Sequence, residues 1–284
     1  MAKGILAKIV LVAAASSIPA VLHGQENIPE ITVEGTRATL PDATQSVRAI
    51  ANATNGNLAR YEVGVCPGVA GLPRALANGI VDEMRVDISN AGVKLAPKGC
   101  SANLTVIVTD SGSELIEELS KSSRDLFDTL SGRDIHLLKA SSGPAWWWHT
   151  VQPRRADGGP VAQSDSGGPE AYTVKGATMS RLSSSVRQDI TSGIVVLEVG
   201  ALDGLTVRQI AGFAVMRGLS STRNRQTDRF GYETILSLFE GSGAVAEMTG
   251  FDRAYLSALY SGSNGFTFDQ KTRQIAQKVA AEAE

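Results

Sequence analysis

The segment from residue 193 to residue 221 constrains the fold more than any other part of the chain. Its first part, Gly193–Val199, is an almost continuous apolar run that predicts a buried strand. A turn at Asp203-Gly204 leads into Leu205–Ser221, a predicted helix with apolar residues on both sides. Thr206 and Gln209 have the spacing of a capping box at its start. Because both sides of this helix need covering, we expect it at the centre of the molecule.

The remaining segments place most predicted strands early and most predicted helices late. Apolar alternation over 60–66 and the apolar run over 104–109 predict strands. Helical spacing predicts helices over 72–90 and 113–130, while 135–138 and 180–190 are expected to be strands. Further helices are expected near 232–240, 249–260 and 268–282. This order favours an α+β fold, with a small mixed sheet, packed helices and a helical C-terminal third.

The chain begins like an exported protein. Lys3 and Lys8 precede a short apolar run from Ile9 to Ala15, and Gly24 provides a small residue before Gln25. This pattern is typical of a Sec-type signal peptide over 1–24 that is cleaved near Gly24. The apolar run is too short to span a membrane, and no later stretch stays apolar for roughly 18 residues. We expect a periplasmic or secreted protein with no integral membrane segment after signal removal.

An even pair of cysteines fits the same compartment. Cys66 and Cys100 are the only cysteines in the chain. In an exported protein such a pair predicts a disulfide bond. The bond would contribute about 3–4 kcal/mol to stability by restricting the unfolded chain.

Composition excludes several classes of partner. The chain has 27 basic and 29 acidic residues and a formal net charge of −2, with no basic block beyond Arg154-Arg155. Nucleic acid is therefore not an expected partner. After signal removal His136 and His149 would be the only histidines, and the cysteines are expected to be paired. This supply is too small for a typical zinc site, so neither a metal nor a cofactor is expected.

We expect three parts along the chain: the signal peptide at 1–24, a disordered polar segment at 25–57, and a single α+β domain at 58–284. Within the domain, glycines and prolines accumulate between residues 141 and 171. Such a density of helix and strand breakers predicts a long loop. A loop near 30 residues in a compact domain is usually functional or mobile.

The predicted loop contains the best candidate binding surface, Trp146-Trp147-Trp148-His149. Three adjacent tryptophans cannot all face one core on a strand or a helix, so we expect at least one to be exposed or covered by the loop itself. Exposed tryptophans favour carbohydrates, peptide partners or membrane interfaces. If the run binds, a Trp147→Ala variant should keep its stability nearly intact and show weaker retention on the cell envelope or peptidoglycan. The alternative is a loop that only plugs the core.

The stretch Ser164–Pro169 reads SDSGGP, which is close to the nucleophile motif of chymotrypsin-like serine proteases. Ser166, His149 and Asp157 are the only set that could form a triad. All three would lie on one Gly-rich loop, whereas catalytic groups need rigid support. The stretch consists mainly of turn-forming residues. We therefore interpret it as part of the loop and assign no catalytic residue.

The helix at 205–221 resembles the active-site helix of zincin-type metalloproteases, because a strand and a short turn precede it and it ends in Gly218-Leu219. Aligning this ending places Ala211, Gly212 and Val215 where the family has the His, Glu and His of its HExxH motif. The resemblance implies a degenerate, non-catalytic relative.

A closer likeness covers Arg60 to the C-terminus. It rests on GC-x-x-NL-x-V at 99–106, TILSLF at 234–239 and MTGFDRAYLSALY at 248–260. These motifs are similar to a family of uncharacterised exported proteins of α-proteobacteria, and the family implies no established activity. Thr249 and Asp252 occupy cap positions at the start of the last motif.

These features predict an exported, non-catalytic binding or envelope-associated domain. Its partner would be an unknown envelope component, a peptide or a carbohydrate. The alternative is a hydrolase, either a degenerate metalloprotease relative or an enzyme using carboxylates around Glu198, Asp203 or Asp252. No spacing in the sequence pairs these carboxylates, and catalysis needs them to face each other.

Overall fold

A computed structural model of the chain describes residues 39–163, 172–173, 184–223, 232–241 and 245–282. The predicted signal peptide at 1–24, the first part of the segment at 25–57 (residues 25–38) and the SDSGGP stretch lie outside these ranges.

The centre of the described structure is a mixed sheet with strand order β1-β2-β6-β3. Strands β1 (Pro67–Ala70), β2 (Leu104–Thr109) and β6 (Val186–Glu198) run parallel, and β3 (Ala145–Arg155) is antiparallel to β6. Strands β1 and β3 therefore form the two edges. The short strands β4 (Ala162–Gln163) and β5 (Tyr172–Thr173) form a separate pair.

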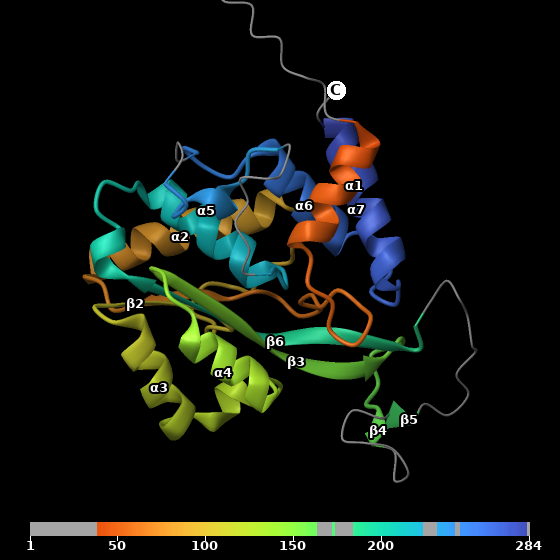
Figure 1. Ribbon diagram of the computed structural model, residues 1–284, viewed down its shortest axis with the longest axis horizontal. Helices are drawn as coiled ribbons and strands as arrows, with labels where there is room; N and C mark the ends of the chain where they lie inside the picture. Colours follow the sequence, from red (N-terminus) through yellow and green to blue (C-terminus); the bar gives the residue numbers. More distant parts are fainter. Residues whose placement is uncertain (1–38, 164–171, 174–183, 224–231, 242–244, 283–284) are drawn as a thin grey trace, which may run out of the picture. The chain divides into compact units, whose positions relative to one another are not determined.

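Helices cover both faces of this sheet (Figure 1). On one face lie α2 (Arg74–Asn90) and α5 (Val207–Leu219), backed by α6 (Gly250–Tyr260), α7 (Phe268–Glu282) and α1 (Leu40–Ile50). On the other face lie α3 (Gly112–Ser122) and α4 (Gly132–Ala140). The 3₁₀ turns are η1 (Arg124–Phe127), η2 (Val199–Ala201) and η3 (Ile235–Ser237). The α+β prediction is confirmed.

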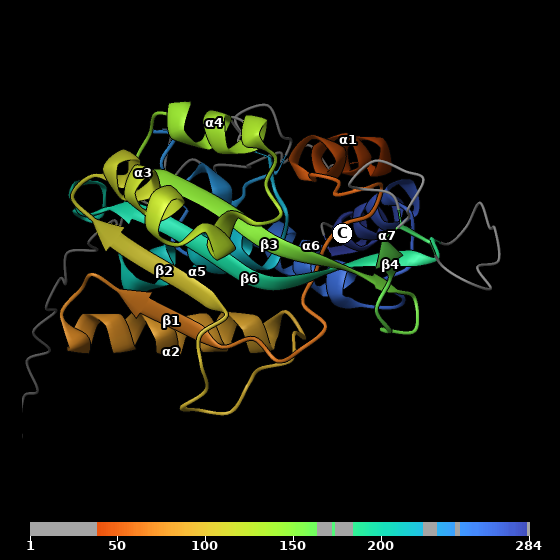
Figure 2. The ribbon, with the colours of Figure 1, turned by 90° about the horizontal axis from the view of Figure 1, so that it is seen from below.

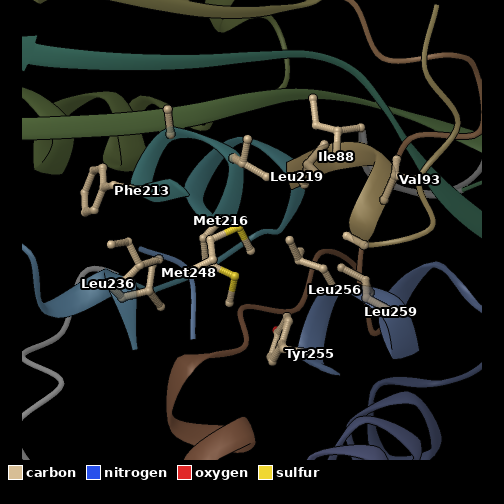
Figure 3. Close-up of a cluster of buried hydrophobic side chains, with 14 of the residues drawn as sticks. Ile88, Val93, Phe213, Met216, Leu219, Leu236, Met248, Tyr255, Leu256 and Leu259 are labelled. Carbon is tan, nitrogen blue, oxygen red and sulfur yellow. The ribbon is translucent and has the colours of Figure 1, made fainter. Parts of the chain in front are cut away.

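Helix α5 takes the central position expected from its sequence. It packs between the sheet and the outer helices, and its capping box joins Thr206 and Gln209 as predicted. Figure 3 shows its Phe213, Met216 and Leu219 among buried side chains from α2, α6 and their neighbours. Near its end the helix lies directly on β2, because a Cβ added at Gly218 would be 2.1 Å from Leu104 Cδ1.

Part of the segment 25–57 that was expected to be disordered forms a helix. Helix α1 lies inside the segment expected to be disordered, and a capping box of Thr39 and Asp42 starts it. Its apolar side, which includes Val47 and Ile50, is buried in the main core. The helix was missed because only four of its positions face the core, so polar residues dominate the segment.

Three other local predictions are also wrong. The loop expected at 141–171 contains β3, a long strand that includes the whole tryptophan run. The strand expected at 135–138 belongs to α4, which begins at a capping box of Ser131 and Asp134. The helix expected over 113–130 ends at Ser122 and continues as η1. In each case helix caps and burial in the tertiary structure decide the type and bounds of the element, and the local composition does not.

The disulfide prediction is confirmed. Cys66 and Cys100 are bonded, with their Cα atoms 6.1 Å apart and a sequence separation of 34. The bridge ties the segment entering β1 to the segment entering β2. Asn103 reinforces the junction, because its Oδ1 accepts a hydrogen bond from the Cys66 amide at 2.7 Å. Among the helices within the described ranges, none is long and apolar enough to cross a membrane.

Candidate functional site

A cavity in the described structure runs along the free edge of β3. Its volume is about 570 Å³. Three segments form its walls besides β3: residues 52–55 after α1, residues 129–141 leading into and along α4, and residues 221–223 after α5. Figure 2 shows β3 as the outermost strand on the side of the sheet where α1 and α4 lie. We call this cavity the edge groove.

All four residues of the predicted binding run, Trp146 to His149, contribute to the edge groove. They do so from within a strand, so neighbouring side chains point to opposite faces of the sheet. Because helices cover both faces, none of the three tryptophans is fully exposed. The run therefore packs its tryptophans against the covering helices, and the same residues line a cavity.

Trp146 and Trp148 point toward α3 and α4 and are 3% and 4% exposed. The Trp148 ring stacks on Phe127 with centroids 5.0 Å apart, and its Nε1 donates to the Leu126 carbonyl at 2.9 Å. The Trp146 Nε1 donates to the Ser141 carbonyl at 3.3 Å. These rings serve mainly as the core of the α3–α4 side.

Trp147 points to the opposite face and meets α5. The guanidinium carbon of Arg217 lies 3.6 Å from the Trp147 ring centroid, and Phe213 makes an edge contact. The Trp147 Nε1 donates to the Thr222 carbonyl at 3.1 Å. Arg217 is itself buried and donates to the Thr222 hydroxyl at 3.0 Å. Removing the Trp147 ring would remove these contacts, so we expect Trp147→Ala to destabilise the fold rather than to leave its stability nearly intact.

His149 is buried on the same side of the sheet as Trp147. Its Nε2 lies 3.0 Å from the Gly218 carbonyl, which requires that this nitrogen carry the proton. Burial lowers the pKa of His149 from 6.5 to about 4. The ring is therefore neutral at neutral pH, and its position holds the end of α5 against β3.

The buried His149 gives a pH-dependent contribution to stability. Between pH 6.5 and 4 the unfolded chain binds a proton on His149 that the folded chain does not. Stability therefore falls as the pH falls through this window. We expect His149→Gln, which keeps a donor for Gly218, to reduce the loss between pH 7.5 and 4.5 by about 2–3 kcal/mol. Urea unfolding of both proteins at both pH values measures this, and an unchanged pH dependence would contradict it.

The structure does not bring the hypothetical serine triad together within the described residues. His149 bonds to the Gly218 carbonyl, and the Asp157 carboxylate is bonded to Arg155 and to the Gly159 amide in an exposed turn. Ser166 lies outside the described ranges. His136 is exposed on α4.

The carboxylates considered for a hydrolase lie on separate elements. Glu198 ends β6 and accepts a hydrogen bond from the Gly112 amide at the start of α3 at 3.1 Å. Asp252 is completely buried as the cap of α6. Asp203 is exposed in the turn before α5. Glu198 and Asp252 therefore each bind the start of a helix. In the described part of the chain, no group of three or more His, Cys, Asp or Glu side chains could hold a metal ion.

The positions that align with the zincin motif are part of the core. Ala211 and Val215 are fully buried, and a Cβ added at Gly212 would be 2.9 Å from Met248 Cγ. These positions have no ligand groups and no space for larger ones without rearrangement of η3 and its neighbours.

Comparison with known proteins gives no relative. No protein-family model, no curated protein sequence and no solved structure matches the chain.

Of the residues that line the edge groove, the sequence indicated only the run Trp146 to His149 as a candidate surface, and it gave no sign of the other walls. The missed residues include Thr54, Thr129, Asp134 and Leu137, together with the segment 221–223. They lie on loops and on the exposed side of a short helix, where no periodicity marks them. The strand itself could have been predicted from the run AWWWHTV at 145–151. Its alternate side chains pack on opposite faces of the sheet, as residues of a β-strand do.

Proposed function

We propose that this protein is an exported, non-catalytic binding protein of the cell envelope, and that the edge groove is its binding site. The observation that carries the proposal is the convergence of the whole predicted binding run on one cavity. The volume of about 570 Å³ falls within the usual range of ligand pockets, roughly 300–1,000 Å³.

The chemistry of the walls supports a polar ligand with hydrogen-bonding groups along its length. Apart from the aromatic run, hydroxyl and amide side chains dominate the lining, which includes Asn52, Thr54, Asn55, Ser131 and Ser221. One acidic and one basic side chain, Asp134 and Arg223, also line it. Peptides and carbohydrates both match such a mixture of aromatic edges and neutral polar groups.

The disulfide supports the exported location, because such bonds persist mainly in oxidising compartments. The proposal also includes a Sec-type signal peptide and a periplasmic or secreted destination. It includes the likeness to exported α-proteobacterial proteins as well. The non-catalytic assignment is supported by the structural engagement of His149, Glu198 and Asp252.

A matched pair of surface variants tests the proposal. Leu137 is 54% exposed on the groove side of α4, and Leu76 is 41% exposed on α2, outside the groove. Replacing either with arginine should change stability by no more than about 0.5 kcal/mol. We expect Leu137→Arg to reduce retention of the mature chain on a purified α-proteobacterial envelope fraction at least about fivefold, a loss of roughly 1 kcal/mol. Leu76→Arg should be retained like the parent protein.

Equal retention of the two variants would reject the edge groove as the binding site. Circular dichroism of both variants before the assay shows whether each is folded. Because Leu76 and Leu137 are exposed to a similar degree, non-specific effects of the added charge should be the same for both.

A further inference from the structure

The hydrogen bonding of β3 fixes the direction of its main-chain groups. The Glu198 amide donates to the Pro144 carbonyl at 2.9 Å, so Pro144 faces β6. In an antiparallel ladder alternate residues face the partner strand. Trp147 and His149, which are three and five residues further along, therefore direct their N–H and C=O groups away from β6. This direction is the free edge of the sheet.

Thr129 gives independent support for this direction. Its hydroxyl donates to the His149 carbonyl at 3.3 Å and accepts from the Val151 amide at 3.0 Å. Both groups belong to odd-numbered positions of β3. One threonine side chain thus takes the place that a neighbouring strand would have at this part of the edge.

The edge is also closed beyond Val151. Pro153 has no N–H to present, and the Arg155 amide donates to the Gly159 carbonyl at 2.8 Å in the turn that follows the strand. Such devices are the usual protection of an exposed edge strand. The protected part of the edge therefore runs from the His149 carbonyl to Arg155.

Among the described residues, none protects the part of the edge that lines the groove in this way. Within the described ranges, no residue bonds to the outward N–H and C=O of Trp147 or to the outward N–H of His149. The side chains of both residues are nevertheless held firmly, by Arg217, Thr222 and the Gly218 carbonyl. A fixed donor, acceptor and donor are therefore presented in a row, with alternate residues about 6.8 Å apart as in any strand.

We propose that the edge groove binds an extended peptide, which adds to the sheet as a strand beside β3. The peptide residue opposite Trp147 would accept from its N–H and donate to its C=O, as main-chain pairing in strand addition requires. A glycan has no comparable alternation of donors and acceptors at this spacing. The polar walls favour a peptide with polar side chains. This inference rests on the proposed function, because it names the ligand class of the same groove.

The probe for the test is a displayed library of random linear octapeptides, selected on the mature chain and then scanned by N-methylation. A methyl group on a peptide nitrogen removes one donor and blocks pairing at that residue alone. We expect an alternating pattern: methylation at the residues facing β3 weakens binding about tenfold or more, and methylation between them changes it less than about twofold. Leu137→Arg should lose the selected peptides, and Leu76→Arg should keep them.

The outcomes separate this inference from the proposed function. A library that yields no groove-dependent peptide, or a peptide that tolerates N-methylation at every position, overturns strand addition. If envelope retention still depends on Leu137, and soluble glycan fragments of peptidoglycan compete for it, the groove is a binding site for carbohydrate. If retention is also independent of Leu137, the proposed function fails as well.

Discussion

Replacing Trp147 with alanine is expected to lower the free energy of unfolding by about 3–5 kcal/mol, the usual cost of deleting a large aromatic side chain from a core. The ring lies against the Arg217 guanidinium and touches Phe213, and its Nε1 bonds to the Thr222 carbonyl. The substitution leaves a cavity beside a buried cation. Guanidinium unfolding of the parent and the variant measures the loss.

A Trp147→Phe variant is the matched control. It keeps an aromatic face for Arg217 and loses the indole hydrogen bond to Thr222. We expect it to cost about 1–2 kcal/mol. A loss below about 1 kcal/mol for Trp147→Ala would contradict the packing described for this side chain. The large expected loss also means that a binding defect in Trp147→Ala is not informative about the groove.

Replacing Asp252 with alanine is expected to have an effect of similar size, about 3–5 kcal/mol. The carboxylate is fully buried and accepts from the Thr234 hydroxyl at 2.5 Å, the Ile235 amide at 2.8 Å and the Thr249 amide at 2.9 Å. It therefore joins the start of α6 to η3. Its removal leaves three buried or half-buried donors without their acceptor.

The chain offers an exposed version of the same cap as a control. Asp42 forms a capping box with Thr39 at the start of α1, where both residues are exposed. We expect Asp42→Ala to cost only about 0.5–1 kcal/mol, because water replaces the lost acceptor. Chemical unfolding of the two variants under the same conditions gives the comparison. Equal losses would show that Asp252 acts only as an ordinary helix cap.

The elements that could be predicted from sequence are those in which the local apolar spacing and helix caps agree with the burial of the element in the fold. Helix α7 was predicted with its observed bounds, and α6 and α5 nearly so, because apolar spacing and caps mark them. The cap positions of Thr249 and Asp252 are confirmed. Elements that depend on distant partners were missed. Helix α1 is stable through its contact with α7, and nothing in its own polar sequence shows that contact.

Strand β3 was missed for a different reason. Its sequence contains three tryptophans, Pro153 and charged residues, and it lies between glycine-rich segments, so its composition resembles a loop. Pro153 is tolerated because the strand is at an edge, and the tryptophans are accommodated because helices cover both faces. Neither condition is visible without the topology. The groove depends on the same topology, since its walls come from three segments far apart in sequence.

The claim that ligand binds in the edge groove is tested most directly by photo-crosslinking. A benzophenone amino acid placed at Leu137 reports on what occupies the groove in cells that export the chain, and the same probe at Leu76 reports on α2. The account predicts a discrete cross-linked product from position 137 and none from position 76. Products from both positions, or from neither, would contradict it.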